Sequence, residues 1–482
     1  MLFNSIDFAI FLPIVFVVYW FITNKNLKLQ NFLIVASSYF FYGWWDWRFL
    51  FLIFLSSLVD YLVGRGFSKI ENQTKRKLLL ATSIIFNLGL LIFFKYYNFF
   101  IDNFVTAFTF LGNPIKINTL DIILPVGISF YTFQTLSYSI DVYRRKLKPT
   151  NDFIAFLAFV SFFPQLVAGP IERATHLLPQ FYTKRIFDYN NAVLGVRQIL
   201  WGLFKKIVIA DNCAEYANLI FNNSTDYVGL ALVLGALFFT FQIYGDFSGY
   251  SDIAIGTSRL LGFDLMRNFN FPYFSRDIAE FWRRWHISLS TWFRDYLYIP
   301  LGGSRGSIWL KIRNTFIIFI VSGFWHGANW TFIVWGALNA IYFLPLLLTK
   351  NNRANLDIVA KGKYLPTIKE FFAMLMTFAL TVFAWIFFRA ETITHALQYI
   401  RDIFKYFSSF WSLHIYWNYR IPIILILLFL IIEWIGREDE FAISNFGLKW
   451  KRVFRWIFYL LICLSILLLG SVDKTEFIYF AF

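Results

Sequence analysis

The sequence predicts an all-α fold, that of a polytopic membrane protein with about 11–12 transmembrane helices and at least one re-entrant segment. The first observation is composition: of 482 residues, 58% are hydrophobic and 22% aromatic, but only 15% are charged. Soluble proteins use roughly 25% charged residues, and so apolar a chain could not cover its surface with polar groups. The second observation is a series of apolar runs, many of them near the ~20 residues that cross a hydrocarbon core.

Twelve apolar runs are expected to form the helices, and the ninth is long enough to fold back on itself. They cover residues 3–22, 30–45, 48–63, 78–100, 121–142, 151–168, 192–212, 228–245, 314–349, 370–388, 421–435 and 456–472. No Lys or Arg precedes Lys25, so the first run lacks the basic region of a secretory signal and is expected to be a retained span. With no long linker or internal repeat, residues 1–482 are expected to form a single integral-membrane domain.

Basic residues decide the expected orientation. The net charge of +15 comes from 44 Lys and Arg against 29 Asp and Glu, and the basic residues gather in short loops between apolar runs. This pattern follows the positive-inside rule and argues against nucleic-acid binding. The loops expected in the cytoplasm are 65–77, 144–148, 173–185, 350–369 and 437–455. Loops 101–120 and 222–227 are poor in basic residues, which places them and Met1 outside the cytoplasm.

Residues 151–168 lie between two of the basic loops, so a full crossing would expose one loop on the wrong side. We therefore expect a re-entrant segment. Within SFFPQLVAGP, Pro164, Gly169 and Pro170 interrupt a helix. Interrupted backbone is tolerated at membrane depth only where protein or a cavity covers it. A structural kink is the alternative interpretation.

His326 is the first candidate for catalysis. Residues 314–349 contain no Asp, Glu, Lys or Arg, and an ionisable group at membrane depth is costly and often functional. These 36 residues would make ~54 Å of helix, slightly less than two crossings. A turn near His326 is therefore expected, with Trp325 and Asn329 as supporting residues, and the histidine would lie at the bottom of a cavity. A neutral histidine that packs between helices is the alternative.

Residues 281–306 form a second candidate, in which basic residues alternate with aromatic ones. Arg283 and Arg284 could bind an anionic donor such as a nucleotide-bearing cofactor or carrier. At helical spacing, Trp282, Trp285 and His286 share one face, whereas Arg283 and Arg284 project elsewhere. The alternative is an interfacial helix, with tryptophan and arginine at the lipid headgroups.

A third candidate is YGDFSGYSDIAIG at residues 244–256. Buried carboxylates need partners, so Asp246 is expected to orient a histidine or to pair with an arginine of residues 281–306. A solvated interfacial carboxylate is the alternative. The sequence has no GxxxxGK[ST] and no cysteine cluster at metal-ligand spacing, and no convincing Ser/His/Asp set. Histidine acting as general base on a hydroxyl is therefore the favoured chemistry.

These motifs carry a family resemblance. FWRRWHISLSTWFRDYLYIPLGG around His286 and FWHGANWTFIVWG around His326 resemble motifs of the membrane-bound O-acyltransferase family. FFPQLVAGPIER at 162–173 and YGDFSGYSDIAIG at 244–256 are similar to motifs of its bacterial branch. The opening MLFNSIDFAIFLP and the tail EFIYFAF resemble the polysaccharide O-acetylases of the alginate-modifying kind, with Ala481 in place of the familiar Gln.

The resemblance implies an acyltransferase of a bacterial cytoplasmic membrane, built around a central funnel or tunnel. In it, His326 matches the catalytic histidine and His286 the second histidine. It also implies transfer of an acyl group, commonly acetyl, from a cytoplasmic thioester such as acetyl-CoA, without a permanently bound cofactor. The acceptor would be the hydroxyls of a cell-surface polysaccharide, reached directly or through an extracytoplasmic acetyl-handling partner protein.

Two alternative functions stay open at this point. One lies within the same family: transfer of D-alanine from a carrier protein toward teichoic acid. The other is a passive transporter or flippase of lipid-linked saccharide, in which the ionisable residues at membrane depth would line a permeation path.

Overall fold

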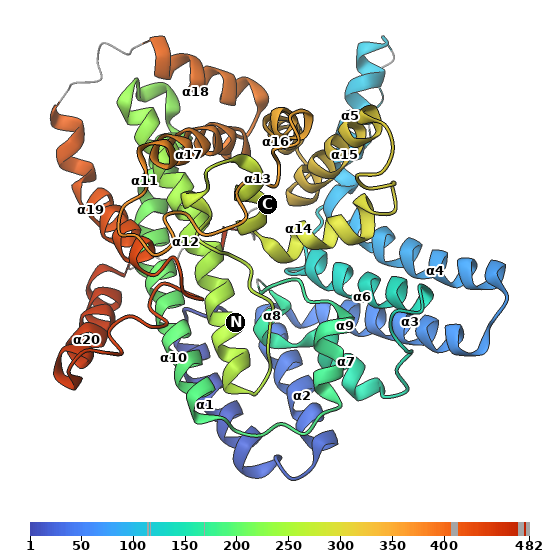
Figure 1. Cartoon of the computed structure of the whole chain (residues 1–482). Helices are drawn as coiled ribbons and strands as arrows, with labels where there is room; N and C mark the ends of the chain where they lie inside the picture. Colours follow the sequence, from blue (N-terminus) through green and yellow to red (C-terminus); the bar gives the residue numbers. More distant parts are fainter. Residues whose placement is uncertain (113–114, 116, 168, 406–412, 471–476, 479–482) are drawn as a thin grey trace. The chain divides into compact units, whose positions relative to one another are not determined.

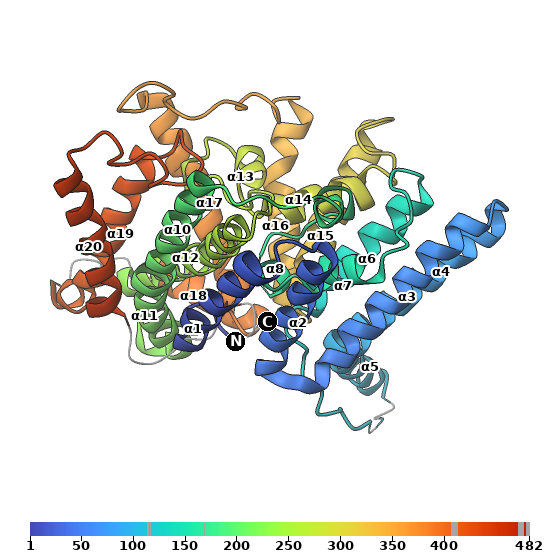
Figure 2. The same cartoon turned by 90° about the horizontal axis from the view of Figure 1, so that it is seen from below.

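The computed structural model describes residues 1–112, 115, 117–167, 169–405, 413–470 and 477–478. Within these residues the chain has helices and no strand, so the all-α prediction is confirmed (Figures 1 and 2). In chain order the helices are α1 (Ile6–Val17), α2 (Leu27–Asp46), α3 (Leu50–Lys69), α4 (Gln73–Leu91), α5 (Tyr97–Phe110), α6 (Ile128–Tyr143), α7 (Phe153–Ser161), α8 (Phe163–Leu166), α9 (Ala174–Leu177), α10 (Tyr189–Leu203), α11 (Asp211–Asn222), α12 (Leu230–Leu260), α13 (Ile278–Arg284), α14 (Ile287–Phe293), α15 (Ile308–His326), α16 (Trp330–Leu348), α17 (Ile368–Arg389), α18 (Ile393–Lys405), α19 (Leu413–Ile435) and α20 (Arg452–Leu469).

Each expected apolar run overlaps at least one of these helices. Parts of four expected segments lie outside the described residues. They are residues 113–114 and 116 of the loop 101–120, residue 168 of the re-entrant segment, residues 471–472 of the last run, and residues 476 and 479–482 of the tail motif. Helix α18 was not expected as an apolar run, because its apolar residues recur at helical spacing among polar ones.

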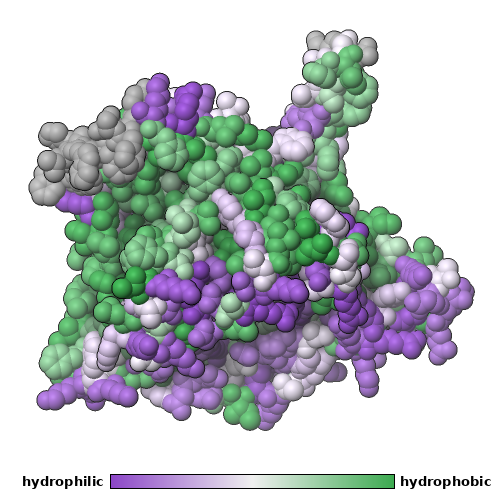
Figure 3. Space-filling view, turned by 45° about the horizontal axis from the view of Figure 1, so that its top comes forward, coloured by the Kyte–Doolittle hydropathy of each residue, from purple (hydrophilic) through white to green (hydrophobic). Residues whose placement is uncertain are grey.

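Seven helical segments in the described part of the chain are long and apolar enough to cross a membrane. They are Leu27–Lys69, Gln73–Phe110, Leu230–Leu260, Ile308–His326, Trp330–Leu348, Ile368–Arg389 and Arg452–Leu469. Hydrophobic side chains cover broad areas of the surface seen in Figure 3, which is the property of a protein whose solvent is lipid. The fold is that of a multi-pass membrane protein. The expected number of 11–12 crossings stays a prediction, because it includes shorter helices as well.

The helices group into two compact units, Met1–Ala192 with Thr257–Met266, and Val193–Gly256 with Arg267–Phe482. In the first unit, α3 and α4 lie side by side and pack against α6 (Figure 2). Asp60 of α3 joins the three helices, because its carboxylate accepts hydrogen bonds from Asn87 Nδ2 at 2.6 Å and from Ser139 Oγ at 2.5 Å. The expectation of one domain over residues 1–482 stays a prediction.

The segment expected to be re-entrant is broken into two short helices. Helix α7 ends at Ser161 and α8 begins at Phe163 with Pro164 in its first turn. Every residue from 155 to 161 is at most 9% exposed, so protein covers the segment on all sides. The interruption of the helix is therefore confirmed, and the covering that interrupted backbone needs at membrane depth is present. Its re-entry from the cytoplasmic side stays a prediction.

Candidate active site

The hairpin of α15 and α16 positions His326, which is the last residue of α15. The chain turns through Gly327, Ala328 and Asn329 before α16 begins. The turn expected from the length of this apolar run is therefore confirmed. Asn329 caps α16, because its side-chain oxygen accepts a hydrogen bond from the backbone N–H of Thr331 at 3.0 Å.

Two glycines let the arms of this hairpin approach closely. A Cβ atom on Gly323 of α15 would collide with the carbonyl oxygen of Phe332, and one on Gly336 of α16 would collide with that of Phe319. Small residues at such positions allow helix backbones to approach each other. The glycines therefore fix the separation of the two helices next to His326.

The His326 side chain is 3% exposed and lies among aromatic rings. Its ring centroid is 4.9 Å from that of Trp325, 5.3 Å from that of Trp335 and 5.2 Å from that of Phe388. The three rings stand at 70° to 88° to the imidazole, which is the edge-to-face geometry that aromatic pairs prefer. Such walls hold the imidazole in one orientation and limit the access of water.

His286 occupies a strained position at the start of α14. Its φ of 42° lies in the left-handed region, which costs roughly 1–3 kcal/mol for a residue other than glycine and is frequent at functional sites. The backbone N–H of the next residue, Ile287, donates to the carbonyl of Asn268 at 2.9 Å and helps to hold this turn. His286 lies outside the seven spanning helices and is 1% exposed. Burial lowers the pKa of its imidazole to about 3, so the ring is neutral.

Trp325 brings the two histidine motifs together. Its ring centroid is 6.1 Å from that of His286 and 4.9 Å from that of His326. The motifs are 40 residues apart in the sequence, yet one indole touches both imidazoles. Trp285 is also fully buried nearby, with its ring 5.2 Å from that of Trp385.

A cavity of about 580 Å³, which we call the hairpin cavity, opens at the turn of α15 and α16. It is lined by the turn itself, by aromatic rings and by polar side chains. Its lining includes Gly327, Ala328, Asn329, Thr331, Phe332, Phe239, Phe388, Gln242, Asn218, Arg389 and Glu391. Gly327 directly follows His326 in the chain, and Phe388 contacts the imidazole ring of His326. His326 itself is not among the residues that line this cavity, so its expected place at the bottom of a cavity stays a prediction.

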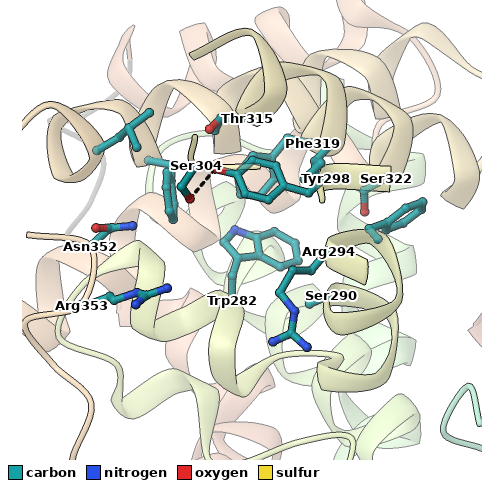
Figure 4. A pocket seen from close by; sticks show the side chains of 14 residues that line it. Trp282, Ser290, Arg294, Tyr298, Ser304, Thr315, Phe319, Ser322, Asn352 and Arg353 are labelled. Carbon is teal, nitrogen blue, oxygen red and sulfur yellow. Dashed lines mark hydrogen bonds between the residues drawn. The ribbon is translucent and has the colours of Figure 1, made fainter. Parts of the chain in front are cut away.

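A second cavity of about 240 Å³, which we call the tryptophan cavity, lies along the other half of the hairpin. Figure 4 shows Trp282 in the middle of its lining, with Arg294 and Arg353 on two sides. Helix α15 contributes Thr315, Ile318, Phe319 and Ser322, and α16 contributes Phe343 and Leu347. Trp335 connects this cavity to the histidine, because its ring lies 5.6 Å from Trp282 and 5.3 Å from His326.

Arg283 and Arg284 do not line either cavity. Arg283 donates from Nη1 to the carbonyl of Asn352 at 2.8 Å and from Nη2 to that of Asn355 at 2.7 Å. Arg284 forms an ion pair with buried Glu280 at 2.8 Å. Both guanidinium groups are thus engaged with protein. The arginines that line the tryptophan cavity are Arg294 and Arg353, and Arg389 lines the hairpin cavity.

Asp246 lies within α12 and pairs with a lysine. Its Oδ1 is 2.8 Å from Nζ of Lys206, and both side chains are at most 3% exposed. Lys206 also contacts Asp211 at 2.7 Å. The expected histidine or arginine partner of Asp246 is therefore wrong. The apolar run expected there ends at residue 245, whereas α12 continues to Leu260, so Asp246 lies inside the helix and not at its end.

Sequence reasoning missed Asn268, Glu280 and Lys206, which hold the residues around the site. The signal for Lys206 was available, because a charged residue inside an apolar run requires a partner. Asn268 and Glu280 carried no signal, since they lie in short segments without periodicity. Among the described residues, no group of three or more His, Cys, Asp or Glu side chains could hold a metal ion.

Fold and site together define a membrane-embedded protein in which two buried histidines contact the same tryptophan, and one of them directly precedes a turn that lines a cavity. The model of the membrane-bound O-acyltransferase family matches residues 144–388. Over 506 aligned residues, the chain is 37% identical to the "Probable alginate O-acetylase AlgI" of Pseudomonas putida, with all of both chains covered. It is 36% identical over 432 residues to the "Peptidoglycan O-acetyltransferase" of Helicobacter pylori, covering 84% of this chain and 80% of the relative.

A more distant relative is the "Teichoic acid D-alanyltransferase" of Bacillus subtilis, 28% identical over 284 residues, with 56% of this chain and 70% of the relative covered. The chain belongs to the membrane-bound O-acyltransferase family and is an O-acyltransferase.

Proposed function

We propose that this protein transfers an acetyl group from a cytoplasmic thioester to a hydroxyl of a cell-surface polysaccharide, either directly or through an extracytoplasmic partner protein. The observation that carries the proposal is the place of His326 at the turn of its hairpin, beside the hairpin cavity and one aromatic ring away from the tryptophan cavity. Two reactants that enter by the two cavities would meet near this imidazole.

The donor thioester binds in the tryptophan cavity. The loop 350–367 contributes Arg353 to this cavity, and this basic loop belongs on the cytoplasmic side by the positive-inside rule. Arg294 and Arg353 are both exposed at its edge, where guanidinium groups can pair with the phosphates of acetyl-CoA or of a carrier-protein arm. The apolar lining suits the acyl end of the donor.

The acceptor hydroxyl enters through the hairpin cavity. His326 removes its proton, and the resulting alkoxide attacks the thioester carbonyl. The tetrahedral intermediate then collapses with cleavage of the carbon–sulfur bond, and the thiolate leaves and takes the proton back from the imidazolium. General base catalysis contributes typically ~10²- to 10⁴-fold, and holding both reactants at one imidazole removes much of the entropic cost of their encounter. His286, with Trp325 between it and His326, is the second catalytic histidine.

The test uses purified protein in liposomes, with labelled acetyl-CoA on one face and a hydroxyl acceptor on the other. We expect label to reach the acceptor with wild-type protein and to fall by at least ~100-fold with His326→Gln, which keeps a polar side chain but no base. His395→Gln is the matched control, because His395 lies on α18, bonds to Ser224 at 3.0 Å and lines neither cavity. Wild-type transfer by His326→Gln would contradict the proposed base.

D-Alanyl transfer is the second candidate, favoured by the similarity to the teichoic acid D-alanyltransferase. Both reactions use a thioester and a hydroxyl, so the same site would serve. A D-alanyl carrier-protein thioester offered in the same liposomes distinguishes them. Transfer from that donor and not from acetyl-CoA would replace acetyl with D-alanyl in the proposal.

A further inference from the structure

We propose that Asn268 is a positioning residue that holds His286 as the tautomer with a proton on Nδ1 and a lone pair on Nε2. Asn268 lies between α12 and α13, and its side chain is 0% exposed. Its Oδ1 is 3.0 Å from Nδ1 of His286. The tautomer itself follows from hydrogen bonding alone. Its consequence for acyl transfer rests on the proposed function, in which His286 takes part.

The orientation of the Asn268 amide is fixed by Ser288. The backbone N–H of Ser288 lies 3.3 Å from Asn268 Oδ1, and the Ser288 hydroxyl donates to the same oxygen at 2.9 Å. A backbone N–H can only donate, so the amide atom that faces it must be the oxygen. On its other side, Asn268 Nδ2 donates to Ser251 Oγ at 3.0 Å. A flipped amide would set two donors against each other at Ser288.

The proton on His286 follows from this orientation. Because Oδ1 of Asn268 has no hydrogen to give, Nδ1 of His286 must be the donor of the bond between them. A neutral imidazole carries one N–H, so Nε2 is left with a lone pair. The fully buried position of His286 keeps the ring neutral, as burial disfavours the imidazolium.

The lone pair on Nε2 has no hydrogen-bond partner among the described residues, although the atom is buried. An unsatisfied buried acceptor is costly and calls for an explanation. The ring of His286 lies 4.6 Å from that of Phe247 and 6.1 Å from that of Trp325. We assign to Nε2 the role of accepting a hydrogen bond from the reactants during transfer. Asn268 does not touch the reactants and acts only by presenting this nitrogen.

The tautomer is read first, by nuclear magnetic resonance of the full chain with ¹⁵N-labelled histidine in lipid nanodiscs, with His286→Gln to assign the signal. We expect a protonated Nδ1 and an unprotonated Nε2 in wild type. Asn268→Asp keeps an acceptor oxygen and should keep this tautomer, whereas Asn268→Leu should give a mixture or the other tautomer. A proton on Nε2 in wild type overturns the proposal, whether or not any variant folds or any donor is accepted.

The second measurement is the acyl-transfer rate. With Asn268→Leu we expect kcat to fall by about 100-fold and the KM values to change by less than about 2-fold, while Asn268→Asp restores most of the rate. Asn270→Leu is the control, because the hydrogen bonds at Asn270 are made by its backbone. If Asn268→Leu changes the tautomer and leaves kcat unchanged, Asn268 has no positioning role in transfer. Absence of transfer in every protein, with the expected tautomers, would count against the proposed function alone.

Discussion

The guanidinium of Arg283 is bonded to the carbonyl of Asn355 at 2.7 Å, so this arginine binds the loop beside the tryptophan cavity and does not line the cavity itself. A second bond, from Nη1 to the carbonyl of Asn352 at 2.8 Å, brackets Arg353 between the two anchored residues. An effect of Arg283 on the donor would therefore pass through the position of Arg353.

The first prediction concerns this loop. We expect Arg283→Ala and Arg353→Ala each to raise the KM for the donor several-fold. The double variant should raise this KM by less than the product of the two single fold-increases. Residues that act through one contact are non-additive. Arg283→Lys should restore little, because lysine lacks the planar fork that reaches two diverging carbonyls. Steady-state kinetics with varied acetyl-CoA measures this, and fully additive effects would show that Arg283 acts independently of Arg353.

The second prediction concerns pH and His176 in the first unit. The carboxylates of Asp264 and Glu172 raise the pKa of His176 from 6.5 to about 10. Because the folded state binds this proton more tightly, the stabilisation is complete below about pH 6.5 and is lost as pH rises to about 10. Thermal unfolding in detergent should show that His176→Gln lowers Tm at pH 6 and that its difference from wild type closes above pH 10.

Two carboxylate variants refine this test. Glu172 is buried and lies 2.8 Å from His176, whereas Asp264 is 75% exposed at 3.6 Å. Exposed pairs are screened by water, so we expect Glu172→Gln to reduce the pH-dependent change in Tm more than Asp264→Asn does. The reverse order would mean that Asp264 is the main partner of the histidine.

The third prediction concerns the packing of the α15–α16 hairpin. We expect Gly336→Ala to destabilise the protein by roughly 1–3 kcal/mol, because the added Cβ would strike the carbonyl of Phe319. Gly89→Ala in α4 is the matched control, since no atom lies within 4 Å of the Cβ it would add. Alanine there should be neutral or gain about 0.5–1 kcal/mol. Equal melting temperatures for the two variants would refute close packing at Gly336.

The fourth prediction concerns the buried pair of Lys206 and Asp246. Lys206→Met should cost about 3–5 kcal/mol, because it leaves buried carboxylates without their cation. Asp246→Asn in the same chain should recover part of this loss, since it removes one of those charges. Thermal unfolding of the two single variants and the double variant gives the coupling. If the double variant loses as much unfolding free energy as the two single variants together, the residues do not interact.

The sequence by itself determined the class of fold and the place of the main turn. Apolar runs near membrane length permit little besides helices, because backbone groups in lipid must be satisfied within the segment. The turn after His326 follows from a run too long for one crossing, and the break after Ser161 from Pro164 and the glycine beyond it. Such features depend on residues that are neighbours in the chain, so they can be predicted from the local sequence.

Only the tertiary structure decided which residues meet. Asp246 pairs with Lys206 because α12 continues past it and carries it into the protein interior. Arg283 binds loop carbonyls and Asn268 binds His286. In the local sequence, however, Arg283 cannot be told from a solvated arginine, nor Asn268 from an asparagine in a turn. The physical reason is that a buried polar group takes the partner that the fold brings within hydrogen-bond distance. That distance is set by the packing of segments remote in the chain, which periodicity and spacing do not encode.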